Sequence, residues 1–291
     1  MSANGQAHPQ HSDPGVSTPV TLRTLRRMAS AGDAFACLTC YDATTARWLA
    51  RAGVHVLLVG DTAAETVLGY SSTVHMPMDI AVALTGAVKR GAPHRVVMAD
   101  MPFMSYQAEE ADAIRNAGRF ITEGSADIVK LEVDASFGDL VGRLARAGIP
   151  VCAHIGARPQ TAGLTGGYAS AGRTDDTAER IVADARAMER AGAVMVLIEA
   201  VPSEVADRVV AETTIPVIGI GAGPAPHGQI VVLNDLIGLS DWQPPFAPRL
   251  GEVGEQIRDA ASAWVGRVAA REVTTHRYAM KPTAAQAEPA R

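Results

Sequence analysis

Lysine is scarce in this chain of 291 residues. Among its 26 basic residues only Lys89, Lys130 and Lys281 are lysine, and the others are arginine. Lys130 lies inside an apolar stretch that predicts a buried strand, where a compact ammonium group needs a partner or a function. The scarcity therefore makes Lys130 a candidate functional residue.

Several features that mark other classes of protein are also missing. The net charge is −5 and no basic block occurs, which argues against nucleic acid or an anionic membrane as a partner. No apolar run approaches the roughly 20 residues that span a bilayer, so we expect no membrane span. The N-terminus lacks a charged segment followed by an apolar one, which predicts a cytoplasmic protein.

The three cysteines, Cys37, Cys40 and Cys152, are too few for a disulfide framework. Cys37 and Cys40 form a C-x-x-C spacing, which occurs in some metal and redox sites. On a strand, however, positions i and i+3 point to opposite faces, and no second pair is present to complete a metal site. We therefore expect small, buried core residues.

Short apolar runs that end near a polar side chain recur along the chain, and such runs are typical of parallel strands buried on both faces. Seven of them, and an eighth apolar segment, lie at residues 35–40, 54–59, 96–99, 128–131, 150–153, 194–198, 215–220 and 229–239. Helical patterns separate most of them, which indicates an α/β fold with a parallel sheet. The prediction is a single (β/α)₈ barrel.

The chain divides into one domain and two terminal segments. The first residues are rich in Ser, Gly, Pro, His and Gln, so we expect a disordered extension over residues 1–20. The barrel is predicted for residues 21–275, closed by a helix at 251–270, and a flexible tail for 276–291. Long loops at 62–78 and 156–173 follow strand ends, where function tends to reside.

Three acidic residues, Asp61, Asp100 and Glu132, end the second, third and fourth predicted strands. A barrel brings these ends together, and carboxylates that share a cavity repel one another unless a cation lies between them. Ligands that are all oxygen favour a hard ion such as Mg²⁺ over zinc. The alternative is that each acid only caps the helix that follows it.

Other ionisable residues occupy the same rim. Lys130 lies two residues before Glu132, so both side chains point the same way. The lysine could hold a substrate anion, form a Schiff base, or simply pair with Glu132. Glu199 ends the sixth strand, and partial burial would give it the raised pKa that suits a general base. His154 ends the fifth strand and either binds a substrate carboxylate or is a satisfied core histidine.

Together these stretches resemble the ketopantoate hydroxymethyltransferase family over residues 20 to 240. The matching segments are Leu38-Thr39-Cys40-Tyr41-Asp42, Leu58-Val59-Gly60-Asp61-Thr62, Arg90-Gly91-Ala92-Pro93, Ala99 through Tyr106, Val129-Lys130-Leu131-Glu132, Gly166-Gly167-Tyr168, Glu199-Ala200-Val201-Pro202 and Pro216 through Gly223. They occur in the order found in the family, which is more specific than any single motif.

The resemblance implies a barrel of the phosphoenolpyruvate/pyruvate-utilising type, usually assembled as a homodecamer. It implies transfer of a hydroxymethyl group from 5,10-methylenetetrahydrofolate to 3-methyl-2-oxobutanoate, which gives ketopantoate through a metal-stabilised enolate in pantothenate and coenzyme A synthesis. Each subunit would hold one Mg²⁺ ion on Asp61, Asp100 and Glu132. The 2-oxo acid would be bound by Asp61, Thr62, Asp100 and Lys130, with Glu199 as the proton acceptor.

The chain also departs from the family pattern. Thr62 stands where members usually have Ser, and Val133-Asp134 replaces a Gly-Gly pair after Glu132. Arg158 lies in a loop that is normally uncharged, and the segments Ser72 through Met78 and Tyr168 through Gly172 differ as well. The metal and base positions are kept, so these departures bear on substrate side chain and folate use rather than on enolate chemistry.

Three other functions fit parts of the sequence. One is a related metal-dependent C–C lyase or mutase that acts on another 2-oxo acid, with Arg158 reading an additional anionic group. A second is a metal-free Schiff-base aldolase that uses Lys130. A third is a non-catalytic relative, which the complete set of ionisable residues disfavours.

Overall fold

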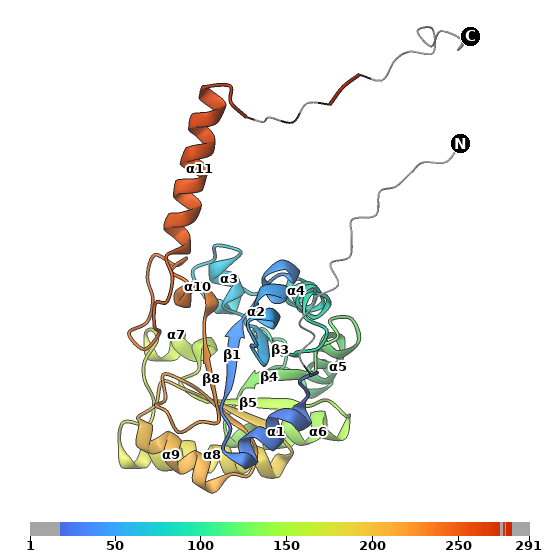
Figure 1. The fold of residues 1–291 in the computed structure, drawn as a ribbon. Coiled ribbons are helices and arrows are strands. Elements are labelled where there is room, and N and C mark those ends of the chain that lie inside the picture. The colour runs from blue at the N-terminus through green and yellow to red at the C-terminus, as the bar shows by residue number, and fades with distance from the viewer. Residues whose placement is uncertain (1–17, 274–275, 277, 281–291) are drawn as a thin grey trace, which may run out of the picture.

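The computed structural model describes residues 18–273, 276 and 278–280. Eight parallel strands form a closed barrel, in which β1 pairs with both β2 and β8 (Figure 1). The strands are β1 (Phe35–Thr39), β2 (Val56–Val59), β3 (Val96–Asp100), β4 (Ile128–Glu132), β5 (Val151–Gly156), β6 (Met195–Glu199), β7 (Val217–Ile220) and β8 (Gly228–Val231). The predicted (β/α)₈ barrel is confirmed.

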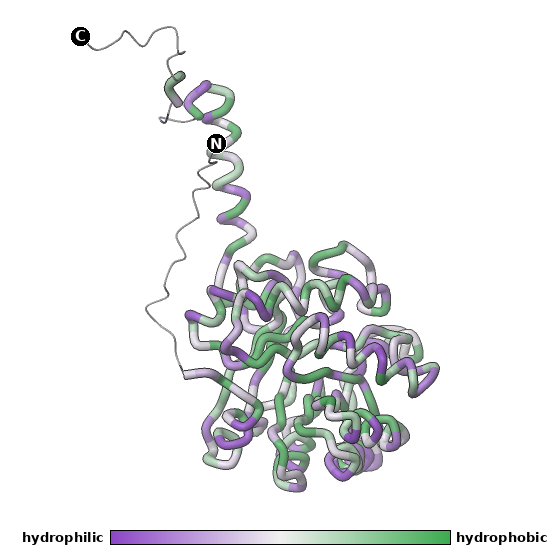
Figure 2. The backbone as a smooth tube through the Cα atoms, turned by 90° about the vertical axis from the view of Figure 1, so that its right-hand side faces the viewer, coloured by the Kyte–Doolittle hydropathy of each residue, from purple (hydrophilic) through white to green (hydrophobic). Residues whose placement is uncertain are grey.

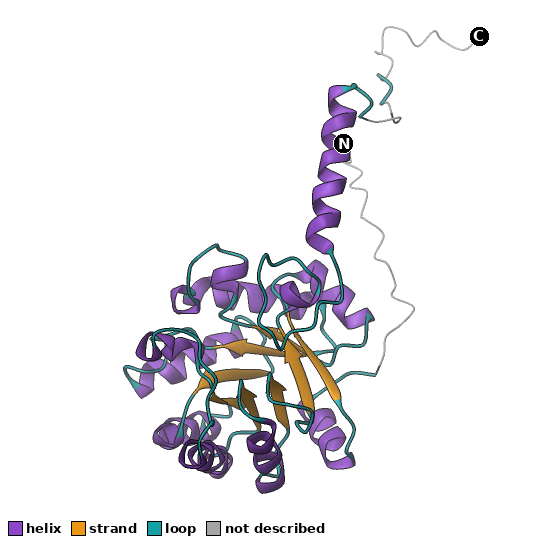
Figure 3. Cartoon of the chain, turned by 90° about the vertical axis from the view of Figure 1, so that its left-hand side faces the viewer, coloured by secondary structure: helices purple, strands orange, loops and turns teal. Residues whose placement is uncertain are grey.

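Most helices surround the strands on the outside of the barrel, as Figure 3 shows. The helices of the described residues are α1 (Leu22–Ala31), α2 (Ala43–Arg51), α3 (Ala63–Thr66), α4 (Met78–Gly91), α5 (Glu110–Thr122), α6 (Gly138–Arg146), α7 (Ala162–Thr165), α8 (Asp175–Ala191), α9 (Ser203–Glu212), α10 (Leu233–Leu236) and α11 (Val253–Ala269). Short 3₁₀ helices lie in the loops at Thr73–His75, Ala135–Phe137 and Pro159–Thr161. Thr174 begins α8 with a capping box, and Gly192 ends it in a left-handed conformation.

The strands bury both faces, because alternate side chains fill the barrel interior and the layer beneath the helices. Cys37 packs in the interior with residues such as Met98 and Ile128, whereas Cys40 packs in the outer layer. All three cysteines are free and buried, as predicted. This alternation also carries the side chains at the strand ends into the mouth of the barrel.

Helix α1 contributes to the interior core of the barrel rather than to its outer ring. Leu25 is fully buried and belongs to the same apolar cluster as Phe35 and Val56, which lie at the beginnings of their strands. Thr21 begins the helix with a capping box, and Gly32 ends it with a positive φ of 76°. The helix therefore seals the N-terminal end of the barrel, and the C-terminal mouth stays available for polar groups.

The eighth apolar segment is shorter as a strand than the sequence indicated. Only β8 is extended, and the rest of 229–239 forms α10 and a turn. Leu233 N donates to the buried hydroxyl of Thr39 at 2.9 Å, which places this backbone group just after the strand ends. No helix separates β7 from β8, because Gly221 and Gly223 adopt positive φ and turn the chain back within residues 221–227.

The closing helix forms where it was predicted but does not cover the barrel. None of the residues of α11 is buried, and the helix projects away from the body of the molecule (Figure 1). No helix in the described part of the chain combines the length and apolar character needed to cross a membrane. Most of the predicted extension at 1–20 and tail at 276–291 lies outside the described residues.

Candidate active site

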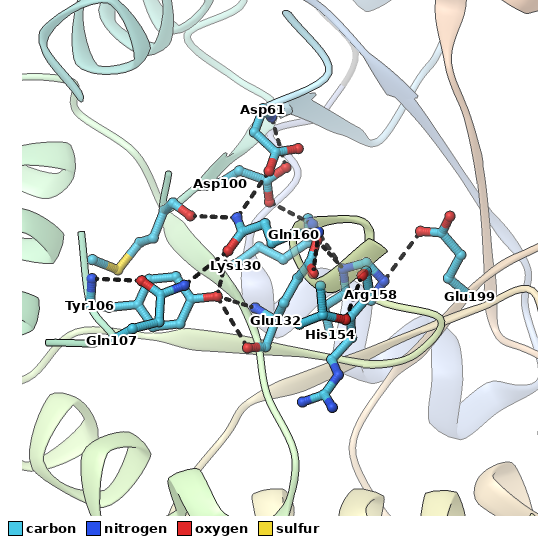
Figure 4. A network of polar contacts seen from close by, with 12 residues as sticks. Asp61, Asp100, Tyr106, Gln107, Lys130, Glu132, His154, Arg158, Gln160 and Glu199 are labelled. Atoms are coloured by element: carbon cyan, nitrogen blue, oxygen red, sulfur yellow. Dashed lines mark hydrogen bonds and ion pairs between the residues drawn. The ribbon is translucent and has the colours of Figure 1, made fainter. Parts of the chain in front are cut away.

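The C-terminal mouth of the barrel gathers the ionisable residues selected from the sequence (Figure 4). In the strand register Asp100 lies beside Lys130, and Glu132 lies beside His154. Lys130 and Glu132 share the inward face of β4, as their spacing predicts. Each of these four residues is at most 6% exposed, so their charges interact with little screening by water.

Asp61 and Asp100 are held together rather than serving as helix caps. The backbone N–H of Asp61 donates to Asp100 Oδ2 at 3.0 Å. The helix that follows Asp61 has no side-chain cap, whereas Asp42 does cap α2 through the N–H groups of Thr44 and Thr45. Burial, and then the charge of Asp100, raise the pKa of Asp61 to about 7. The capping alternative therefore fails for this pair.

Lys130 pairs with Asp100, not with Glu132 as one reading of the sequence proposed. Its Nζ lies 2.7 Å from Asp100 Oδ1 and 3.1 Å from His154 Nδ1. Burial opposes the positive charge, but the neighbouring carboxylates outweigh it and raise the pKa of Lys130. The lysine is therefore a charged ammonium, which donates to His154 Nδ1.

This contact fixes the tautomer of His154. Burial and the Lys130 charge lower the pKa of the imidazole well below its usual value, so the ring is neutral. Because Nδ1 accepts from the ammonium, the ring proton is on Nε2, which lies 3.2 Å from Glu199 Oε2. His154 is therefore not a satisfied core residue. It lies between Lys130 and Glu199, and its buried Nε2 is close to the carboxylate but makes no hydrogen bond within the described residues.

Glu199 is the most accessible acid of the group, with a side chain 20% exposed. Burial raises its pKa to about 7. Ala200, the next residue, has a φ of 49°, a left-handed conformation that costs a non-glycine residue about 1–2 kcal/mol. Its N–H still donates to Ile220 O at 2.9 Å, so the strained turn is anchored where the chain leaves β6. A carboxylate in this setting suits a general base.

Glu132 lies deeper, and burial raises its pKa well above the usual value. Its Oε2 accepts the backbone N–H of Gln160 at 2.9 Å, and its own N–H donates to the hydroxyl of Tyr106 at 3.1 Å. The side-chain amide of Gln160 also donates to Asp61 Oδ2 at 2.9 Å. Gln160 and Tyr106 are not among the candidate residues chosen from the sequence, because a single glutamine or tyrosine in a loop has no periodicity or spacing that marks it.

Two residues that depart from the family pattern contact each other. Arg158 Nη1 lies 2.8 Å from Asp134 Oδ2, so the loop after β5 is tied to the loop after β4. Asp134 also accepts the N–H of Ser136 at 3.0 Å. Thr62 begins α3, partly exposed, and its side chain caps no helix N–H. It remains at the rim, beside Asp61.

The donor set of the mouth fits a hard divalent cation. Asp61, Asp100, Glu132 and Glu199 face one ammonium and a neutral imidazole, and the raised pKa values of three of them reflect this excess of buried negative charge. A divalent cation would offset it with the oxygen ligands that Mg²⁺ prefers. As the side chains stand, no three His, Cys, Asp or Glu residues of the described chain form a closed metal cluster.

Solved structures with the same fold include enzymes of 2-oxo and phosphono acids. The structure of 2,3-dimethylmalate lyase, a PEP mutase/isocitrate lyase superfamily member, superposes with a TM-score of 0.59 at 21% identity and covers 86% of this chain and 88% of that chain. A phosphonopyruvate hydrolase in complex with oxalate and Mg²⁺ gives a TM-score of 0.57 at 13% identity, with 87% and 88% covered. At these identities the likeness concerns the fold.

Sequence comparison identifies the family. Residues 19–275 match the sequence model of ketopantoate hydroxymethyltransferase. The 3-methyl-2-oxobutanoate hydroxymethyltransferase of Anaeromyxobacter dehalogenans is 45% identical over 257 residues, 87% of this chain and 84% of that protein. The protein of the same name from Mycolicibacterium paratuberculosis is 44% identical, with 87% and 89% covered. With this match along nearly the whole barrel, the chain belongs to the ketopantoate hydroxymethyltransferase family.

Proposed function

We propose that this chain is a 3-methyl-2-oxobutanoate hydroxymethyltransferase that uses 5,10-methylenetetrahydrofolate as its one-carbon donor and Mg²⁺ as its metal. The product is ketopantoate, with water supplying the oxygen of the new hydroxymethyl group. One observation carries the proposal beyond family membership. Glu199, with a pKa of about 7, lies 3.2 Å from Nε2 of the neutral His154, whose Nδ1 accepts from an ammonium beside a cluster of buried carboxylates.

Asp61, Asp100 and Glu132 are the residues that would hold the metal. A bound Mg²⁺ ion supplies Lewis acidity, which stabilises negative charge on the 2-oxo oxygen when the C3 proton leaves. Lys130 has a third N–H without an acceptor among the described residues, and we assign it to a carboxylate oxygen of the 2-oxo acid. Thr62 offers a hydroxyl at the same rim.

Glu199 would take the C3 proton of 3-methyl-2-oxobutanoate. The acid is ionised in a large fraction of molecules near neutral pH, and its accessible carboxylate faces the mouth. The Nε2–H group of His154 lies 3.2 Å from Glu199 Oε2, so its dipole favours the ionised form before the transfer. The one-carbon unit is released when water adds to the methylene carbon and its two C–N bonds break, which leaves tetrahydrofolate. Carbanionic C3 then forms a bond to that carbon, whose water-derived oxygen becomes the hydroxyl oxygen, and the proton held by Glu199 is returned to solvent.

The alternatives fit the geometry less well. A Schiff base needs a neutral amine, whereas Lys130 is held as an ammonium by Asp100. A lyase or mutase that reads a second anion through Arg158 would need that guanidinium to be available, but it is paired with Asp134. Both observations favour the hydroxymethyltransferase reaction.

We further infer a cytoplasmic homo-oligomer, a decamer by the family resemblance. The feature that supports assembly is α11, whose apolar side chains Ile257, Trp264, Val265 and Val268 are between 47% and 66% exposed in the single chain. Exposed apolar side chains in such a row are typical of surfaces that bind another protein.

The most direct test follows exchange of the C3 proton of 3-methyl-2-oxobutanoate in D₂O by NMR. We expect exchange that needs Mg²⁺ but not folate, and a loss of about 10²–10⁴-fold in Glu199→Gln. Exchange that continues at the wild-type rate in this variant would remove Glu199 from the base role. Trapping of the substrate by borohydride would instead support the Schiff-base mechanism.

A further inference from the structure

Gln160 makes more polar contacts at the mouth than its place in a loop would suggest. It is 6% exposed and lies in the 3₁₀ helix that follows β5, between the carboxylates of Asp61 and Glu132 (Figure 4). Its Nε2 donates to Asp61 Oδ2 at 2.9 Å and to Met101 O at 3.0 Å. Its backbone N–H donates to Glu132 Oε2 at 2.9 Å.

The orientation of this amide is fixed from its other side. Gln160 Oε1 accepts from the hydroxyl of Tyr106 at 2.8 Å and from Nε2 of Gln107 at 3.1 Å. Both hydrogens of the NH₂ group therefore meet acceptors and the carbonyl meets donors, so a flipped amide would oppose like groups. A buried side chain with every polar atom satisfied holds its neighbours in one arrangement.

In each of the two carboxylates, one oxygen accepts a hydrogen bond from Gln160, and the other oxygen is left for another ligand. Asp61 Oδ1 has no hydrogen-bond donor among the described residues, and Glu132 Oε1 lies 3.8 Å from Nδ1 of the neutral His154, too far for a hydrogen bond. Carboxylates that ligate metals are commonly oriented in this way by a second hydrogen bond, and removing that partner weakens metal binding. We propose that Gln160 is a positioning residue, which orients Asp61 and Glu132 for a divalent cation.

This inference rests on the metal assignment in the proposed function. Arg158 lies two residues before Gln160 in the same loop and pairs with Asp134. This ion pair holds the backbone of the loop next to Gln160. Replacing the side chain would remove the hydrogen bond to Asp61 and leave the backbone bond to Glu132. We therefore expect the variant to bind the cation more weakly but not to lose the site.

The test titrates the folded protein with Mn²⁺ alone, as a paramagnetic substitute for Mg²⁺, and measures free Mn²⁺ by EPR. We expect Gln160→Met to raise the Kd for Mn²⁺ by about 10–100-fold. Gln107→Met is the matched control, because it removes only one of the two donors to Gln160 Oε1 and is expected to keep the wild-type Kd.

The outcomes separate the two proposals. If the wild type does not bind Mn²⁺, or if Asp61→Asn binds it equally well, the metal site of the proposed function fails and the inference with it. If the wild type binds but Gln160→Met has the same Kd, only the role of Gln160 is overturned. Should Gln160→Met not fold, Tyr106→Phe removes the hydroxyl that holds the amide, and an unchanged Kd in that variant would overturn the inference.

Discussion

At the scale of single residues, the neighbouring side chains of Lys130, His154 and Glu199 determine the protonation states of the site. The ammonium requires His154 Nδ1 to accept, and this leaves the Nε2 proton for Glu199. A charged lysine, a neutral histidine and an acid with a pKa of about 7 follow from burial and mutual contact. Burial alone would disfavour the charged lysine, and a free glutamate carboxyl has a pKa of only about 4.3.

Replacing His154 with leucine is predicted to raise the pKa of Glu199 further, because its ionised form loses the polar Nε2–H group that lies 3.2 Å from its Oε2 and gains an apolar neighbour. Glu199 acts only when ionised, so the rise of C3–H exchange with pH should move to higher pH. Exchange should fall at pH 7 and recover at pH 9, as measured by NMR. His55→Leu, at the opposite end of the barrel, is the control, and equal pH profiles in both variants would contradict the prediction.

At the scale of elements, the site depends on strands that end together and on an N-terminal end that is sealed. The strand register sets Asp100 beside Lys130, and the interior below them is filled by apolar side chains. Helix α1 completes this interior with Leu25, which has no solvent exposure. The carboxyl ends of the strands can therefore be polar without opening the core to water.

Leu25→Ala is predicted to lower the free energy of unfolding by about 2–5 kcal/mol, since it leaves a cavity at the sealed end of the barrel. Urea unfolding followed by circular dichroism would measure the change. Leu250→Ala is the matched control, because Leu250 is 77% exposed and its truncation creates no cavity. Equal midpoints for the two variants would show that α1 does not contribute to the core.

At the scale of the whole molecule, the single chain is a barrel with one long helix, α11, none of whose residues is buried. Helix α11 carries both polar and apolar residues along its length away from the body (Figure 2). The connection over residues 237–252 leads the chain off the barrel, and α11 does not cover a strand as the helices of the outer ring do. We therefore expect its apolar residues to form the contact with another subunit.

The double variant Trp264→Ser, Val268→Ser is predicted to lower the mass of the assembly while leaving thermal unfolding of the barrel unchanged, because neither side chain is buried in the single chain. Size-exclusion chromatography with light scattering would measure the mass. Trp48→Ser, which alters another exposed tryptophan, serves as the control. A wild type that is already monomeric would exclude assembly through α11.

The sequence by itself determined the barrel and most of its rim, because buried strands and the residues that end them leave a local, periodic pattern. The period of two placed Lys130 and Glu132 on one face, and the apolar runs located the strands that carry Asp61, Asp100, His154 and Glu199. A register of eight strands then brings those ends together whatever the loops contain. The roles assigned to these residues remain predictions until they are tested.

Only the tertiary structure decided which of these residues touch. Lys130 pairs with Asp100 rather than with Glu132, and Gln160, from a loop, donates to both Asp61 and Glu132. These contacts join residues far apart in the sequence, so no local pattern predicts them. The direction of α11 is likewise set by the connection after α10 rather than by the helix's own residues. Helical and strand periods describe local geometry, whereas distances between side chains from different elements exist only once the chain has folded.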